Sequence, residues 1–173
     1  MSKKITIGLN TKDINRAIKE IKKYKQELQV KVEECRKRIA EALAQEVESN
    51  FNSAVVDDTI RGGTRQAEVV VSVDDRGTMT VVVADGEDAV FCEFGAGVYH
   101  NGSVGSSPNP YGSNLGLTIG SYGKGKGKQT ARGYYDENDE VVITRGTPAS
   151  MPMYHAIQTI TQRSIEIAKE VFK

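Results

Sequence analysis

The sequence predicts an α+β fold in which a long N-terminal helix and a C-terminal helix pack on one face of an antiparallel sheet, with a long Gly-rich loop. Three observations support this prediction: a helical apolar repeat before residue 52, short strand-like segments between residues 67 and 144, and a second helical repeat near the C-terminal end. The chain has 173 residues, of which 38% are hydrophobic. We therefore expect a single domain over residues 1–173 with its own core.

The first expected element is a short strand, because Ile5, Ile7 and Leu9 alternate with small or polar residues. Either Asn10 or Thr11 can cap the helix that follows. That helix is expected over residues 12–51, which contain no Pro or Gly. Its apolar positions recur at three- and four-residue steps, with Tyr24 filling one gap: Ile14, Ile18, Ile21, Leu28, Val32, Cys35, Ile39, Leu43, Val47 and Phe51.

A single helix of that span would be roughly 60 Å long, which is more than the core of one small domain needs. Part of the helix should therefore project or pack on another subunit. A break in the polar stretch at residues 24–29 is the alternative.

Charge is distributed unevenly along this helix. Residues 3–38 hold twelve Lys and Arg against five Asp and Glu, and residues 39–60 hold five acids and no base. A solvated helix face is the simpler interpretation. The alternative is head-to-tail packing of identical subunits, basic end against acidic end, as in a ring.

The middle of the chain should hold a hairpin. After a break at Arg61–Thr64, strands are expected at Ala67–Val73 and Met79–Ala84, with Gly77 at positive φ in the turn. One face of the hairpin should hold Val69, Val71 and Val73, with Val81 and Val83 beside them. Residues Ala89–Phe94 fit either a buried strand or a short helix.

A loop at residues 96–133 comes next, and eleven glycines fall from Gly95 to Gly133. We expect this loop to be flexible in the free protein. A second hairpin follows, with strands at Gly133–Tyr135 and Glu140–Thr144 around a polar tip. Gly146 turns the chain, Pro148 stiffens it, and Ser150 can cap a final helix with Pro152 in its first turn and an apolar stripe of Met153, Ile157, Ile160, Ile167 and Val171.

Composition excludes several classes of protein. The net charge of zero argues against a dedicated DNA-binding domain. Cys35 and Cys92 are far apart in apolar surroundings, which indicates two buried thiols instead of a disulfide. No apolar run approaches the ~20 residues of a membrane span, and the first residues lack the apolar stretch of an export signal. We expect no contact with a membrane, and synthesis in the cytosol.

The sequence offers little chemistry. Neither His100 nor His155 lies in a nucleophile pattern, and two Cys with two distant His make a poor zinc site. The acidic run at residues 136–140 lacks the glycine and the final glutamate of a calcium loop. We therefore expect no enzyme activity, no cofactor and no metal.

A phosphate-binding motif is almost matched within the Gly-rich loop. Residues 120–126 fit GxxxxGK, but Gly127 follows where Ser or Thr would bind magnesium. A local basic cluster remains, formed by Lys124, Lys126, Lys128 and Arg132. These cations could contact DNA or an acidic neighbour at an interface. The simpler interpretation is a solvated loop.

Glu93 lies among apolar neighbours, so its carboxylate should be partly buried and must find hydrogen bonds. The amides of the following glycine turn could supply them. Glu93 would then fix the turn and have a structural role. A catalytic acid is the alternative.

Two segments resemble a known family. FCEFGAG at residues 91–97 is similar to the signature of a phage neck and tail-completion family, in which Glu is flanked by apolar and aromatic residues and followed by a Gly–Thr/Ala–Gly turn. Its motif residues here are Phe91, Glu93, Phe94, Gly95 and Gly97. TRGTPASMPMYHAI at residues 144–157 resembles the closing pattern of that family, with a strand ending in Gly146, a turn at Pro148, and the hydrophobic pair Pro152–Met153 before the final helix.

The family includes relatives of the minor tail protein Z of lambdoid phages. This chain departs from the pattern at Ala96, where Thr is common, and in the long insertion after Gly97. The resemblance implies a virion protein at the head–tail junction, in the neck or tail, that presents surfaces, often as rings, and has no active site. It implies partners among copies of itself and other neck, portal or tail proteins, with passing contact with channel DNA. The rivals are a nucleic-acid-binding module using the basic N-terminal helix and Lys-rich loop, and a small hydrolase built around Glu93.

Overall fold

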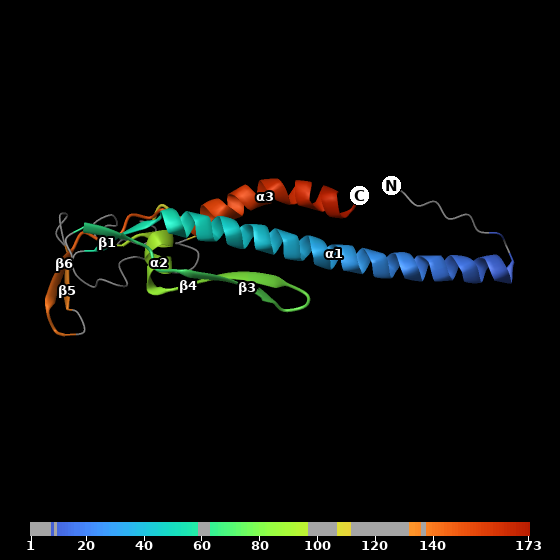
Figure 1. Cartoon of the computed structure of the whole chain (residues 1–173), viewed down its shortest axis with the longest axis horizontal. Coiled ribbons are helices and arrows are strands. Elements are labelled where there is room, and N and C mark those ends of the chain that lie inside the picture. The colour runs from blue at the N-terminus through green and yellow to red at the C-terminus, as the bar shows by residue number, and fades with distance from the viewer. Residues whose placement is uncertain (1–7, 9, 59–62, 97–106, 112–131, 136–137) are drawn as a thin grey trace.

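The computed structural model describes residues 8, 10–58, 63–96, 107–111, 132–135 and 138–173. Figure 1 shows the elements in chain order: α1 (Thr11–Ser53), β1 (Val55–Asp58), β2 (Gly63–Gln66), β3 (Val70–Asp75), β4 (Thr80–Asp85), α2 (Glu87–Phe94), β5 (Arg132–Tyr135), β6 (Val141–Thr144) and α3 (Pro152–Val171). The predicted α+β class is confirmed. The two long helices pack together and against small antiparallel sheets.

Helix α1 is continuous over 43 residues, so the break considered at residues 24–29 does not occur. The side chain of Asn10 caps it, accepting the N–H of Asp13 at 2.8 Å. This interaction satisfies one of the four amides that have no partner at a helix start. No Pro or Gly interrupts the helix before Ala54, where the backbone becomes extended.

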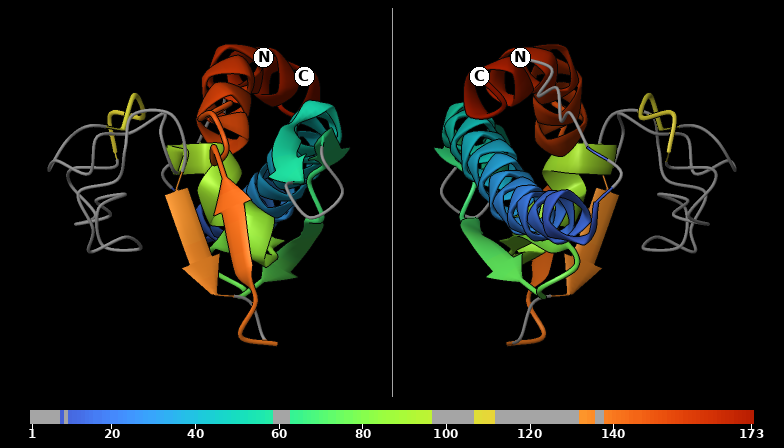
Figure 2. Two further views of the ribbon diagram at one scale, coloured as in Figure 1. Left: turned by 90° about the vertical axis from the view of Figure 1, so that its left-hand side faces the viewer. Right: turned by 90° about the vertical axis from the view of Figure 1, so that its right-hand side faces the viewer.

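Helix α3 runs antiparallel to the second half of α1. Near the start of α3, the side-chain amide of Asn50 donates to the carbonyl of Pro152 at 3.0 Å, and near its end Arg38 pairs with Glu170 at 2.6 Å. The β3–β4 hairpin lies on the other side of α1, as Figures 1 and 2 show. Arg36 ties its tip to α1 through Asp75 at 3.0 Å. The first half of α1 extends beyond both α3 and this tip (Figure 1).

The described strands pair as three separate two-stranded antiparallel sheets, where the sequence led us to expect one sheet. The hairpin β1–β2 was not predicted, because its strands carry few apolar residues and the sequence Arg61–Thr64 indicates a break. In β3–β4, Val73 pairs with Val82 and Val71 with Ala84. The expectation that Val81 and Val83 lie beside Val71 and Val73 is therefore wrong by one residue in register, which moves them to the opposite face.

The main core lies where the C-terminal part of α1 meets α2, β1 and α3. Its buried members are Val47, Phe51, Ala54, Val56, Ala89, Cys92 and Ala156. The absence of a side chain beyond Cβ at Ala156 lets α3 approach closely. The core therefore stabilises the end of the molecule that holds α2, far from the start of α1 (Figure 1).

Several predicted features lie outside the described residues. One is the strand expected at residues 5–9, of which the structure describes only Gly8. The others are Gly97, His100 and the basic residues Lys124, Lys126 and Lys128. Arg132 and Gly133 belong to β5, so the predicted loop ends before them. Residues 107–111, also within the predicted loop, have a defined place against α2. In the described part of the chain, no helix is long and apolar enough to cross a membrane.

Candidate functional site

Helix α2 decides the alternative left open for Ala89–Phe94, which is a helix and not a strand. Gly86 precedes it with φ 140°, and a Cβ there would lie 2.5 Å from the carbonyl oxygen of Glu68. Gly95 ends it with φ 81°, donating its N–H to the carbonyl of Phe91 at 2.7 Å. Both ends of α2 thus need glycine, which alone adopts these backbone angles without strain.

Backbone hydrogen bonds join the end of α2 to the segment before α3. The carbonyl of Cys92 accepts the N–H groups of Ser150 at 2.9 Å and Met151 at 3.0 Å, and the N–H of Ala96 donates to the carbonyl of Thr147 at 2.7 Å. The two segments that carry the family resemblance are therefore in direct contact. We call this region, residues 88–96, 107–111 and 147–154, the α2–α3 junction.

Glu93 is the centre of the junction, with only 7% of its surface exposed. Its Oε2 accepts the N–H of Met153 at 2.8 Å, and its Oε1 accepts the N–H of Tyr154 at 3.0 Å. Oε1 also accepts the side-chain amide of Asn109 at 2.6 Å. The expectation of a buried, hydrogen-bonded carboxylate is confirmed. Its backbone donors, however, come from α3, and the described amides of the glycine turn, those of Gly95 and Ala96, donate to other carbonyls.

Glu93 supplies the cap that α3 lacks locally. The residue before the helix is Met151, which has a left-handed conformation with φ 51° and makes no side-chain capping bond. The predicted cap at Ser150 is therefore wrong, because the hydroxyl of Ser150 faces the carbonyl of Cys92 at 3.4 Å. Amides in the first turn of a helix have no partner within it and attract negative charge. A carboxylate from another helix meets both needs here.

Burial raises the pKa of Glu93 above its usual value. The hydrogen bonds from Met153, Tyr154 and Asn109 act in the opposite direction, because they favour the ionised form, but they do not outweigh the loss of solvent.

Asn109 is a part of the junction that the sequence did not reveal, since it lies within the predicted Gly-rich loop. Only 2% of its surface is exposed. Ser107 holds this segment against α2 by donating its hydroxyl to the carbonyl of Phe94 at 2.9 Å. The ring of Tyr111 meets the ring of Tyr154 edge-on, with 5.9 Å between centroids. The one available signal was the run Ser–Pro–Asn–Pro at 107–110, which is typical of a defined turn.

Asp88 is a second buried carboxylate, at the opposite end of α2, with 6% of its surface exposed. Arg65 in β2 binds it through both guanidinium nitrogens, at 2.6 and 3.0 Å, and the N–H of Glu68 donates to it at 2.8 Å. This role of Asp88 was not predicted from the sequence. Paired with Glu93, it makes α2 a connector between the β1–β2 hairpin and α3.

The other residues of the two resembling segments differ in their burial and backbone conformation. Phe91 and Phe94 are half-buried on α2, and Gly146 has φ 89° after β6. Pro148 is exposed, Pro152 is buried in the first turn of α3, and Met153 packs against the core.

The junction has poor means for catalysis. Cys92 is fully buried, and burial with the nearby Asp88 carboxylate raises its pKa to about 11, so the reactive thiolate is scarce at neutral pH. Both oxygens of Glu93 already accept hydrogen bonds. His155 is exposed on α3, as expected, beside the ring of Tyr154. Among the described residues, no three His, Cys, Asp or Glu side chains converge as metal ligands. The arrangement joins segments of the chain, and its buried carboxylates, Asp88 and Glu93, are both engaged in hydrogen bonds within the chain.

Protein-family models, curated proteins and solved structures give no match to this chain. The resemblance to the neck and tail-completion family therefore stays a prediction from residues 91–97 and 144–157. The contacts among the described residues are an observation that does not depend on this resemblance.

Replacing Glu93 tests its structural role. Glu93→Ala would leave two buried backbone amides without an acceptor and would remove the shorter of two hydrogen bonds from the side-chain amide of Asn109, so the free energy of unfolding should fall by about 3 kcal/mol. Chemical denaturation measures this loss. The matched control is Glu87→Ala, which removes an exposed carboxylate from the same helix and should cost less than about 1 kcal/mol. Equal effects of the two substitutions would contradict the role assigned to Glu93.

The pKa of Glu93 predicts a dependence of stability on pH. A raised pKa means that the folded chain holds this proton more tightly than the unfolded chain, whose Glu titrates near 4.5. The part of the stability that depends on protonation of Glu93 is thus full below that value and is lost as pH rises through the raised pKa. The free energy of unfolding of the wild type, minus that of the non-titrating Glu93→Gln variant, should fall as pH rises from about 4.5 through the raised pKa of Glu93. A difference that grows with pH would mean that the hydrogen bonds outweigh burial.

Proposed function

We propose that this chain is a structural virion protein of a tailed phage or a phage-derived particle. It acts at the head–tail junction, in neck assembly or in tail completion and termination, by presenting surfaces to other subunits. Its partners are further copies of itself and other neck, portal or tail proteins. It has no catalytic step.

The projecting half of α1 is the observation that carries this proposal. Five of its apolar side chains lie on one face of the helix and yet have 39–52% of their surface exposed: Ile14, Ile18, Ile21, Leu28 and Val32, here called the α1 stripe. Covering each of these half-exposed side chains would contribute on the order of 1 kcal/mol. Contiguous exposed apolar surface of this kind marks protein contacts. The stripe therefore favours a subunit that is completed by assembly.

The α2–α3 junction supports the proposal in a second way. The resemblance rests on two segments separated by 46 residues, 98–143, and those segments bind one another through Cys92, Glu93 and Ala96. The carboxylates of Glu93 and Asp88 both accept hydrogen bonds from donors within the chain. The junction is therefore better suited to holding α3 in a fixed position than to catalysing a reaction.

A passing contact with DNA in the channel belongs to the proposal through Lys124, Lys126, Lys128 and Arg132, whose side chains lie outside the described part of the structure. The rival function is a nucleic-acid-binding module. It is favoured by exposed lysines on the projecting half of α1, among them Lys19, Lys22 and Lys25. Binding to phosphates, however, does not explain why apolar side chains are exposed on that half of the helix.

Genetic complementation tests the proposed function in the phage or prophage whose genome encodes the chain. Particles lacking the chain should accumulate unjoined heads and tails, counted by electron microscopy. Ile21→Glu should fail to restore joining while the protein stays folded, because Ile21 is exposed and a charge there blocks only the contact. The matched control is Val30→Glu, the same kind of change at an exposed position on the opposite face of α1, which should restore joining. Normal joined particles in the absence of the chain would overturn the proposal.

A further inference from the structure

The apolar positions of α1 follow a heptad spacing from the projecting half into the packed half. From residue 14 to residue 39 the steps alternate between four and three, and Lys25 is the only member that is not apolar: Ile14, Ile18, Ile21, Lys25, Leu28, Val32, Cys35 and Ile39. A repeat averaging 3.5 residues keeps one seam facing a second helix along its whole length. The α1 stripe thus has the geometry of a surface that another helix covers.

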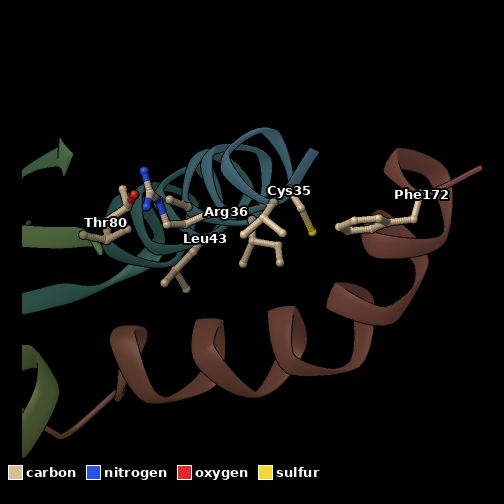
Figure 3. Close-up of a pocket in the computed structure, with 9 residues that line it drawn as sticks. Cys35, Arg36, Leu43, Thr80 and Phe172 are labelled. Carbon is tan, nitrogen blue, oxygen red and sulfur yellow. The ribbon is translucent and has the colours of Figure 1, made fainter. Parts of the chain in front are cut away.

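The stripe leads into a groove of ≈ 400 Å³ between α1, β4 and the end of α3. Val32 belongs to both, and Cys35, Ile39, Val82 and Phe172 line the groove further along. In Figure 3 the side chains of Cys35 and Phe172 point toward one another across it. Stripe and groove form one apolar track of about 38 Å, from the rise of 1.5 Å per helical residue over residues 14–39.

The charges beside the track all have one sign on the projecting half. Lys22 and Lys31 occupy the positions that flank a heptad seam, and Lys25 lies within it; the other flanking residues there are Asn15, Tyr24 and Gln29, together with Ala17, which is buried. The acids of this half of the helix lie at positions turned away from the seam: Asp13, Glu20, Glu27, Glu33 and Glu34. The track is therefore apolar in the middle and cationic at its edges.

A second copy of the chain fits this track poorly. Pairing α1 with another α1 along the projecting half would bring lysines against lysines. The acidic segment at residues 41–48 could supply charge, but in the described structure it has no exposed large apolar side chain to cover the stripe. A DNA duplex fits poorly as well, since its phosphates would leave the stripe uncovered.

We infer that the α1 stripe and its groove bind an amphipathic helix of a different protein, with Asp and Glu flanking its apolar seam. The inference rests on the proposed function and specifies one of its partners. Opposite charges at the flanking positions set partner choice and orientation in paired helices. Self-association of the chain, in a ring or otherwise, then uses other surfaces.

Peptide binding to the full chain tests the inference. The probes are two synthetic helical peptides of about four heptads with the same Leu and Ile seam, one with Glu and one with Lys at the flanking positions, and a fluorescent DNA duplex. Fluorescence anisotropy should give binding of the Glu peptide at least about tenfold tighter than that of the Lys peptide or the DNA, with weakening at high salt. The double variant Lys22→Glu/Lys31→Glu should reverse the peptide preference. Lys19→Glu/Lys23→Glu, the same charge change away from the seam, should keep it.

Equal binding of the two peptides, tighter binding of the DNA, or a solution dimer that Ile21→Glu dissociates would overturn the inference. These outcomes are distinct from failure of the proposed function. A chain that is required for joined particles but does not select the Glu peptide would keep its place in the virion and lose this partner. A chain that selects the Glu peptide but is dispensable for joining would keep the partner surface and lose the proposed function.

Discussion

The carboxylate of Glu93 is the interaction on which the rest of the structure depends. It lies in α2, is nearly inaccessible to solvent, and accepts the first free amides of α3, some sixty residues later in the chain. A buried charge is unfavourable unless it is hydrogen-bonded, and a helix start is unfavourable unless its amides are capped. The amides of α3 supply hydrogen bonds to the buried carboxylate of Glu93, and the carboxylate in turn caps α3. Asn109 adds a third donor, so the loop segment at residues 107–111 is fixed by the same carboxylate.

The exposed half of α1 follows from where α3 begins. With its first turn held at α2, and with Asn50 bonded to Pro152, α3 covers α1 as far as the pair Arg38–Glu170, and Phe172 at its end faces Cys35 just beyond. The β3–β4 hairpin ends at a similar level, where Arg36 binds Asp75. No described element covers α1 before that level (Figure 1). The apolar stripe is thus a consequence of how the folded end is assembled, and it is the surface through which the proposed function would act.

The sequence predicted what depends on neighbours in the chain. The apolar period and the absence of Pro and Gly gave α1, Asn10 was one of its two expected caps, and the apolar context of Glu93 gave its burial. The sequence did not predict the contacts between residues that are far apart in the chain. The donors to Glu93 come from α3 and Asn109, Asp88 meets Arg65, and the strands divide into separate hairpins. Ser150 matches a local capping pattern, but the carboxylate of Glu93, distant in the sequence, caps α3 instead.

Hydrogen exchange at the start of α3 tests the claim about Glu93 most directly. NMR measures the exchange rates of the Met153 and Tyr154 amides in the wild-type chain. The account predicts that both exchange as slowly as amides in the middle of α3, because Glu93 holds them. Exchange at the rates of an unstructured peptide, with the middle of α3 still protected, would contradict it, since the helix would then begin without the carboxylate.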